Sequence, residues 1–162
     1  QSKGEFEEAV AHYRKALEEN VRDPKIFNNL GNAFWSLERN EDAETAYRVA
    51  IEFDPEHFRA QNNLGLLLAS QEKFDEAIAH YRLAIAVSPD YAAAHHNLGD
   101  ALRARGKLDE AVIAYEEALR VDPGFEQASK STRTHFEELA RQGRQRLDKL
   151  VDLITMPHDD ES

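Results

Sequence analysis

The sequence predicts an all-α fold in which helix pairs stack into a solenoid. Equivalent residues recur every 34 positions without an insertion, and a fixed period of this length is typical of repeat architectures. Within one period the apolar residues follow helical spacing twice, first at Phe27, Leu30 and Phe34 and then around Tyr47. Each period therefore holds two amphipathic helices, which bury their apolar faces against each other and against the neighbouring pair.

Five sets of residues carry the period. They are Ala9, Ala43, Ala77 and Ala111; Tyr13, Tyr47, Tyr81 and Tyr115; Ala16, Ala50, Ala84 and Ala118; the Asn-Leu-Gly triplets that begin at Asn29, Asn63 and Asn97; and Pro55, Pro89 and Pro123. We expect the two helices of a pair to approach closely at small residues such as Gly31 and Ala43. Proline marks the end of each pair, because it cannot continue a helical hydrogen-bond ladder. The expected helices lie near 24–37, 41–53, 58–71, 75–87, 92–105 and 109–121.

The beginning of the chain matches only the second half of a repeat, in residues 1–23. We expect a helix near 5–20 whose apolar side, around Phe6 and Val10, is uncovered. An uncovered apolar face tends to find another surface, so this face is a candidate homodimer contact. The truncated start also suggests that the chain is a fragment of a longer protein.

The repeat signature stops after Phe125, although the helical pattern continues. Residues 126–155 carry an apolar stripe from Phe136 to Ile154 and predict one long C-terminal helix that caps the last repeat. Two alternatives stay open: a helix pair broken at Gly143, and a stripe that mediates self-association. The acidic residues 156–162 are expected to be a disordered tail.

These periodic residues resemble the tetratricopeptide repeat (TPR), whose 34 residues carry aromatic, Leu-Gly, aromatic, Ala, aromatic, Ala and Pro in that order. The full repeats would be 24–57, 58–91 and 92–125. Gln61 and His95 replace one aromatic residue, while Leu68 and Leu102 replace the other. The resemblance implies a right-handed solenoid and a scaffold for protein–protein interaction, which binds a partner segment in its concave groove. A self-assembly module or a regulatory segment of a larger, even catalytic, protein are the alternatives.

Composition and motifs argue against other functions for this segment. The net charge of −11 lacks the basic face that nucleic acid needs, and no apolar run approaches the roughly 18 residues of a membrane span. The chain has no cysteine, so thiol chemistry is excluded and a cytoplasmic location is expected. We expect no catalytic site, cofactor or metal: the His95-His96 pair points in two directions on a helix. His80 is interpreted as a helix-surface residue.

The resemblance also implies which residues face the groove, on the first helix of each repeat. They are Lys25, Asn28, Asn29, Asn32, Trp35 and Ser36; Arg59, Asn62, Asn63, Leu66, Ala69 and Ser70; and Ala93, His96, Asn97, Asp100, Arg103 and Ala104. Three cations and one anion give this set a net positive charge, so a neutral or acidic ligand is expected. The clamp by which some TPR domains hold chaperone C-terminal carboxylates needs three cations, and Asn28, Ala93 and Asn97 stand in their places. We therefore expect no carboxylate clamp.

Asn29, Asn63 and Asn97 form a second motif, the asparagine ladder. It resembles the ladder inside the TPR superhelix of O-linked N-acetylglucosamine transferase, which holds the backbone of an extended peptide. A carboxamide donates and accepts at once, which suits any peptide unit. The resemblance implies that the asparagines bind the backbone of the peptide. We expect less regular residues beside them to recognise its side chains: Trp35, Arg59, His96 and Arg103. The alternative is that asparagine before Leu-Gly is simply common in this repeat.

Overall fold

The computed structural model describes residues 22–123 together with Gly4, Val10, Ala11, Lys15, Thr134 and Arg141. Within residues 22–123 the chain forms helices α2 (Pro24–Ser36), α3 (Asn40–Phe53), α4 (Phe58–Ser70), α5 (Phe74–Val87), α6 (Ala92–Ala104) and α7 (Leu108–Val121). Every one of these helices begins and ends within one residue of the expected position. The expected long helix at 126–155, the tail at 156–162 and Phe6 lie outside the described residues.

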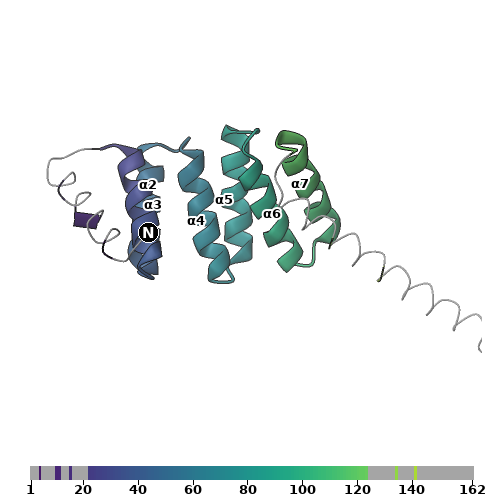
Figure 1. Ribbon diagram of the computed structural model, residues 1–162, viewed down its shortest axis with the longest axis horizontal. Coiled ribbons are helices and arrows are strands. Elements are labelled where there is room, and N and C mark those ends of the chain that lie inside the picture. The colour runs from purple at the N-terminus through teal and green to yellow at the C-terminus, as the bar shows by residue number, and fades with distance from the viewer. Residues whose placement is uncertain are drawn as a thin grey trace, which may run out of the picture.

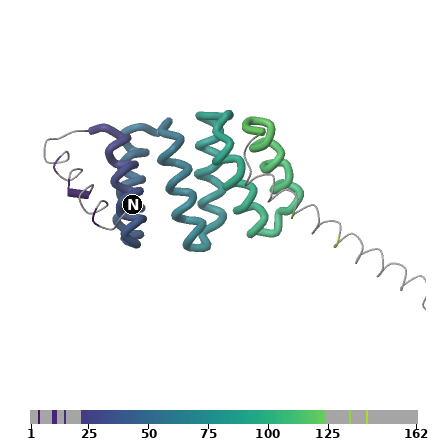
Figure 2. Tube along the Cα trace, viewed as in Figure 1, coloured from purple at the N-terminus to yellow at the C-terminus, as the bar shows by residue number. Residues whose placement is uncertain are grey.

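The helices stand side by side in chain order (Figure 1). The closest partners are α2 with α3, α4 with α5, and α6 with α7, and each pair also packs against the next through α3 with α4 and α5 with α6. The first helices touch as well, α2 against α4 and α4 against α6. The Cα trace in Figure 2 shows the same antiparallel unit repeated along the row. The described part of the chain is thus an all-α solenoid of the predicted kind.

A glycine and a tyrosine fix the contact between the two helices of each pair. Tyr47 is fully buried, and its ring occupies the space beside Gly31, so that a Cβ atom on Gly31 would lie 2.5 Å from the ring carbon Cε1. Gly65 and Gly99 meet the rings of the next two repeats in the same way. The predicted close approach is confirmed, because no side chain larger than hydrogen fits there without moving the tyrosine.

The turn inside each repeat contains one residue in the left-handed region. The residue is Gly106 in the third repeat, with φ of 73°, but Glu38 and Glu72 in the first two, with φ of 59° and 61°. Only glycine adopts this conformation without steric cost, so a glycine in the sequence indicates this turn in the third repeat but not in the first two. In the first repeat, the turn is held by the amide of Arg39, which donates to the carbonyl of Phe34 at 2.9 Å.

The two polar residues that replace an aromatic residue both bond to the preceding turn. Gln61 Nε2 donates to the carbonyl of Pro55 at 3.4 Å, and His95 Nε2 donates to the carbonyl of Pro89 at 2.9 Å. Both side chains are buried, so the hydrogen bonds compensate for their loss of water. His95 therefore has a structural role, as its place in the repeat suggested.

Val10 contradicts one expectation for the start of the chain. It is only 5% exposed and belongs to the same apolar core as Leu30, Ala33 and Tyr47. The prediction of an uncovered apolar face is therefore wrong at Val10, because that side chain is already buried within its own chain. Val10 offers no surface to a second copy.

Candidate functional site

The predicted site residues come from the first helices α2, α4 and α6. Six asparagines define what we call the asparagine face: Asn28, Asn29, Asn32, Asn62, Asn63 and Asn97. On a helix, residues three or four positions apart share a face, so Trp35, Leu66, Ala69, Asp100 and Arg103 lie on the same side.

The asparagines form hydrogen bonds to one another across the repeats. Asn63 Nδ2 donates to Asn28 Oδ1 at 3.0 Å and to Asn32 Oδ1 at 3.1 Å. In the next interface, Asn97 Nδ2 donates to Asn62 Oδ1 at 2.9 Å. A carboxamide nitrogen carries two hydrogens, so Asn63 uses both on α2, whereas Asn97 uses one on α4. The ladder residues are therefore not equivalent, which their identical spacing in the sequence could not reveal.

Exposure separates the predicted residues into two layers. Asn28, Asn62 and His96 are 6%, 2% and 8% exposed, and thus form the floor of the face. Asn29 is exposed, while Asn63 and Asn97 are half-buried. A ligand that lies on this face would therefore contact Asn29, Asn63 and Asn97 before it reached the buried floor.

The buried tyrosines bring their hydroxyl groups to the same face. Tyr47 Oη donates to Asn32 Oδ1 at 2.8 Å, and Tyr115 Oη donates to Asp100 Oδ1 at 2.7 Å. Burial raises the pKa of both hydroxyls well above the usual 10.0, so both remain protonated donors at neutral pH. Tyr81 occupies the same place in the second repeat, where Leu66 stands in the acceptor position. Within residues 22–123 its hydroxyl has no hydrogen-bond partner.

The charged residues in the third repeat are close to one another. Asp100 lies 3.6 Å from His96 Nδ1 and 3.6 Å from Arg103 Nη2, in addition to its bond with Tyr115. The positive charge predicted for Arg103 is thus offset by Asp100. Both residues were predicted to face the groove, but their pairing was not predicted.

A pocket of about 520 Å³ lies where α2 faces the start of α4. Four predicted site residues line it, Lys25, Asn28, Asn29 and Arg59, and its remaining lining residues are Asp54, Glu56, His57 and Phe58. The guanidinium of Arg59 lies 5.5 Å from the centroid of the Phe58 ring. The two cations therefore share the pocket with two carboxylates, and its net charge is near zero.

Trp35 belongs to an apolar part of the face. Trp35, Leu66 and Ala69 are partly buried and pack against the same core. Asn32 on α2 bonds to Asn63 on α4. Trp35 and Leu66 lie one helical turn after these two asparagines, so they are expected to be neighbours as well.

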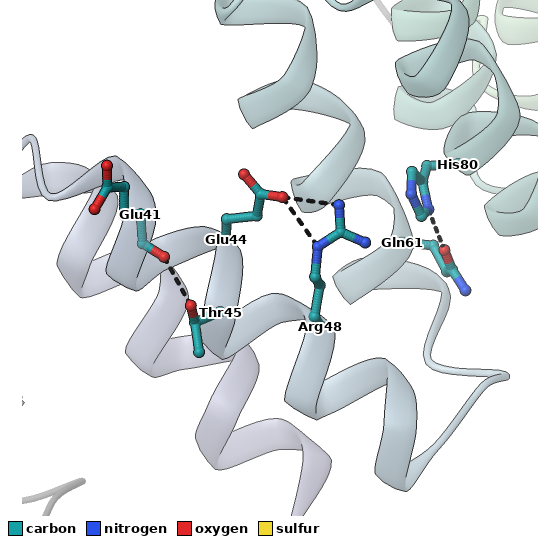
Figure 3. A network of polar contacts seen from close by, with 6 residues as sticks. All are labelled: Glu41, Glu44, Thr45, Arg48, Gln61 and His80. Carbon is teal, nitrogen blue, oxygen red and sulfur yellow. Dashed lines mark hydrogen bonds and ion pairs between the residues drawn. The ribbon is translucent and has the colours of Figure 1, made fainter.

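Figure 3 shows a second group of polar side chains, on α3, α4 and α5. His80 Nδ1 lies 2.7 Å from Gln61 Oε1, and Arg48 bonds through Nε and Nη2 to Glu44 at 3.0 and 2.8 Å. Burial lowers the pKa of His80, and the nearby Arg48 lowers it further, while Glu76 and Glu44 act in the opposite direction. The interpretation of His80 as a surface residue is wrong, because its ring is half-buried and bonded to α4.

Comparison with known families decides the assignment. A family model described as "Tetratricopeptide repeat" matches residues 56–123, and one described as "TPR repeat" matches residues 2–38 and 31–71. The chain belongs to the tetratricopeptide repeat family. No curated protein sequence matches it.

Several solved structures are similar to the chain. A MamA crystal structure has a TM-score of 0.75 at 25% identity, over 95% of this chain and 87% of MamA. The first TPR domain of Spaghetti (RPAP3), bound to the HSP90 peptide SRMEEVD, has a TM-score of 0.70 at 25% identity, over 73% of this chain and 94% of that domain. YrrB, "a TPR protein with an unusual peptide-binding site", has a TM-score of 0.71 at 23% identity, over 81% of this chain and 68% of YrrB. The fold and these neighbours support a protein- or peptide-binding scaffold. Within the described residues, no helix is long and apolar enough to cross a membrane.

Proposed function

We propose that the asparagine face binds an extended segment of a partner protein, with Asn29 and Asn97 as the main contacts to its backbone. The supporting observation is the hydrogen-bonding capacity that these two side chains retain. Asn97 donates one amide hydrogen to Asn62. Its second amide hydrogen and its Oδ1 have no hydrogen-bond partner within residues 22–123. A group with one donor and one acceptor to spare matches one peptide unit.

Asn63 has a different role in this proposal. Both of its amide hydrogens are engaged by α2, and only its oxygen, which Asn62 approaches at 3.5 Å, can face a ligand. Its contribution is to hold α4 against α2, and so to set the distance between the contacts on either side. The three members of the ladder thus divide into two that bind and one that positions the repeats.

The proposed ligand is a neutral segment rather than a strongly acidic one. Arg103 is paired with Asp100, and the cations Lys25 and Arg59 share their pocket with two carboxylates. A clamp for a C-terminal carboxylate is not proposed, because the three cations that it needs are absent. The HSP90 peptide bound to the Spaghetti TPR domain is therefore a poor guide to the sequence bound here.

The test begins with selection of peptides from a phage-displayed random library on the full chain. An enriched peptide is then titrated by calorimetry into the wild type and the variants Asn29→Ala and Asn97→Ala. Each lost amide contact costs about 1 kcal/mol, so each variant should bind about fivefold more weakly. Asn40→Ala, on the exposed start of α3, is the matched control and should bind as the wild type does. If both ladder variants bind as tightly as this control, the proposal is wrong.

A further inference from the structure

We propose that the middle of the asparagine face recognises one large apolar side chain of the bound segment, at Leu66 with Trp35 and Ala69 beside it. This inference rests on the proposed function and adds a specificity to it.

The three repeats differ at one equivalent position of their first helices. Asn32, Leu66 and Asp100 follow one another at 34-residue steps on the first helices α2, α4 and α6. The first and the third accept the tyrosine hydroxyl, at 2.8 and 2.7 Å. Leucine cannot accept a hydrogen bond. The middle repeat therefore leaves the hydroxyl of Tyr81 without a partner among the described residues, in a side chain that is only 1% exposed.

An unpaired polar group of this kind needs an explanation. Buried hydroxyls are almost always hydrogen-bonded, and an asparagine at position 66 would restore the bond that the first repeat makes. A residue that breaks the local pattern of the repeats and leaves such a bond unmade is a mark of a functional position. Leu66 packs against the core but is only partly buried, so the rest of its side chain can make an apolar contact with a ligand, which an asparagine could not make.

The surroundings of Leu66 define the size of the site. Trp35 and Ala69 pack against the same core and are also partly buried, so the apolar surface continues across α2 and α4. Asn32 and Asn63 precede it by one turn on α2 and α4, and Asp100 stands at the position of α6 that is equivalent to Leu66. A short apolar patch between polar neighbours fits one large side chain, such as leucine, methionine or phenylalanine, in an otherwise polar segment.

The experiment uses the full chain and a phage-displayed library of random peptides. The library is selected on the wild type, on Leu66→Asn, and on Leu83→Asn, which makes the same change at a half-exposed position of α5. The wild type and the α5 variant should enrich peptides that share a large apolar residue at one position, and Leu66→Asn should lose that preference. A peptide selected on the wild type should bind Leu66→Asn about tenfold to a hundredfold more weakly. Replacing its apolar residue by alanine should weaken binding to the wild type and leave binding to the variant unchanged.

The outcomes separate the two proposals. If peptides are enriched and Leu66→Asn keeps the same apolar preference, the inference falls and the proposed function stands. If no peptide is enriched on any of the three proteins, the proposed function itself is contradicted. Leu66→Ala tests the same contact without adding a polar group, should Leu66→Asn fail to fold, and should show the same loss of preference. Folding gives an independent check: Tyr81→Phe should lower the unfolding midpoint only in the Leu66→Asn background. A decrease in the wild type would mean that the hydroxyl already has a partner and would remove the argument.

Discussion

Replacing Tyr47, Tyr81 and Tyr115 singly by phenylalanine removes the same oxygen atom from three equivalent positions of one fold. The rings stay in place, and each still fills the space beside the glycine of its repeat. The three variants therefore differ only in what each hydroxyl contacts, so that each serves as a control for the other two.

The structure gives the expected magnitudes. Tyr47 loses a bond to the neutral amide of Asn32, which costs about 1 kcal/mol of unfolding free energy; Asn32 Oδ1 still accepts from Asn63. Tyr115 loses a bond to the carboxylate of Asp100, and hydrogen bonds to charged groups contribute more, so the cost is about 2 kcal/mol. Tyr81 loses no hydrogen bond within the described residues, and its replacement should be neutral or slightly stabilising.

Urea denaturation of the full chain, followed by circular dichroism, measures these differences directly. For a chain of 162 residues, a loss of about 1 kcal/mol also lowers the melting temperature by about 2–4 °C, which gives a second measurement. The expected order of stability is Tyr81→Phe highest, then Tyr47→Phe, then Tyr115→Phe. Equal losses at all three positions, or the largest loss at Tyr81, would refute the hydrogen-bond assignment.

The remaining predictions concern packing, pH and the repeat interface. Gly31→Ala should lower the free energy of unfolding by about 1–3 kcal/mol, because the new methyl group overlaps a tyrosine ring. Gly106→Ala meets no atom within 4 Å and should lower it by only about 1 kcal/mol, through the positive φ of that residue. A denaturation experiment in which Gly106→Ala is the less stable of the two variants would contradict this. Burial and Arg48 lower the pKa of His80 below 6.5, so the unfolded state binds the extra proton: its contribution to stability is complete above about pH 6.5 and is lost as the pH falls below it. Unfolding free energies of wild type and His80→Gln across this range should diverge in that direction, and parallel curves would refute it. Asn63→Ala should lower the melting temperature more than Asn40→Ala does, since it breaks two bonds to α2; equal melting temperatures would contradict that role.

The helices could be predicted from the sequence because their signal is periodic and local. The 34-residue step, the prolines and the helical spacing together located all six described helices, and the glycine–tyrosine contact followed from the small residues on facing helices. These features depend on one repeat at a time, and each repeat supplies an independent copy of the signal.

The candidate site was harder to predict, because its contacts join different repeats. Asn63 bonds to Asn28, 35 positions earlier, and Asn97 bonds to Asn62 in the preceding repeat. Such pairs depend on how one repeat is rotated against the next, which the sequence period does not encode. The error at Val10 has a similar origin: the half repeat was treated as uncovered, whereas its valine packs into the shared core.

Side-chain amide signals in nuclear magnetic resonance spectra report directly whether a partner segment lies on the asparagine face. With a library-selected peptide added to saturation, the carboxamide signals of Asn29 and Asn97 should shift, because their free hydrogens bond to the peptide. The signal of Asn40, at the start of α3, should stay in place. If the peptide binds while Asn29 and Asn97 remain unchanged and the shifts fall on α3, α5 and α7, the ligand lies on another surface and the account is contradicted.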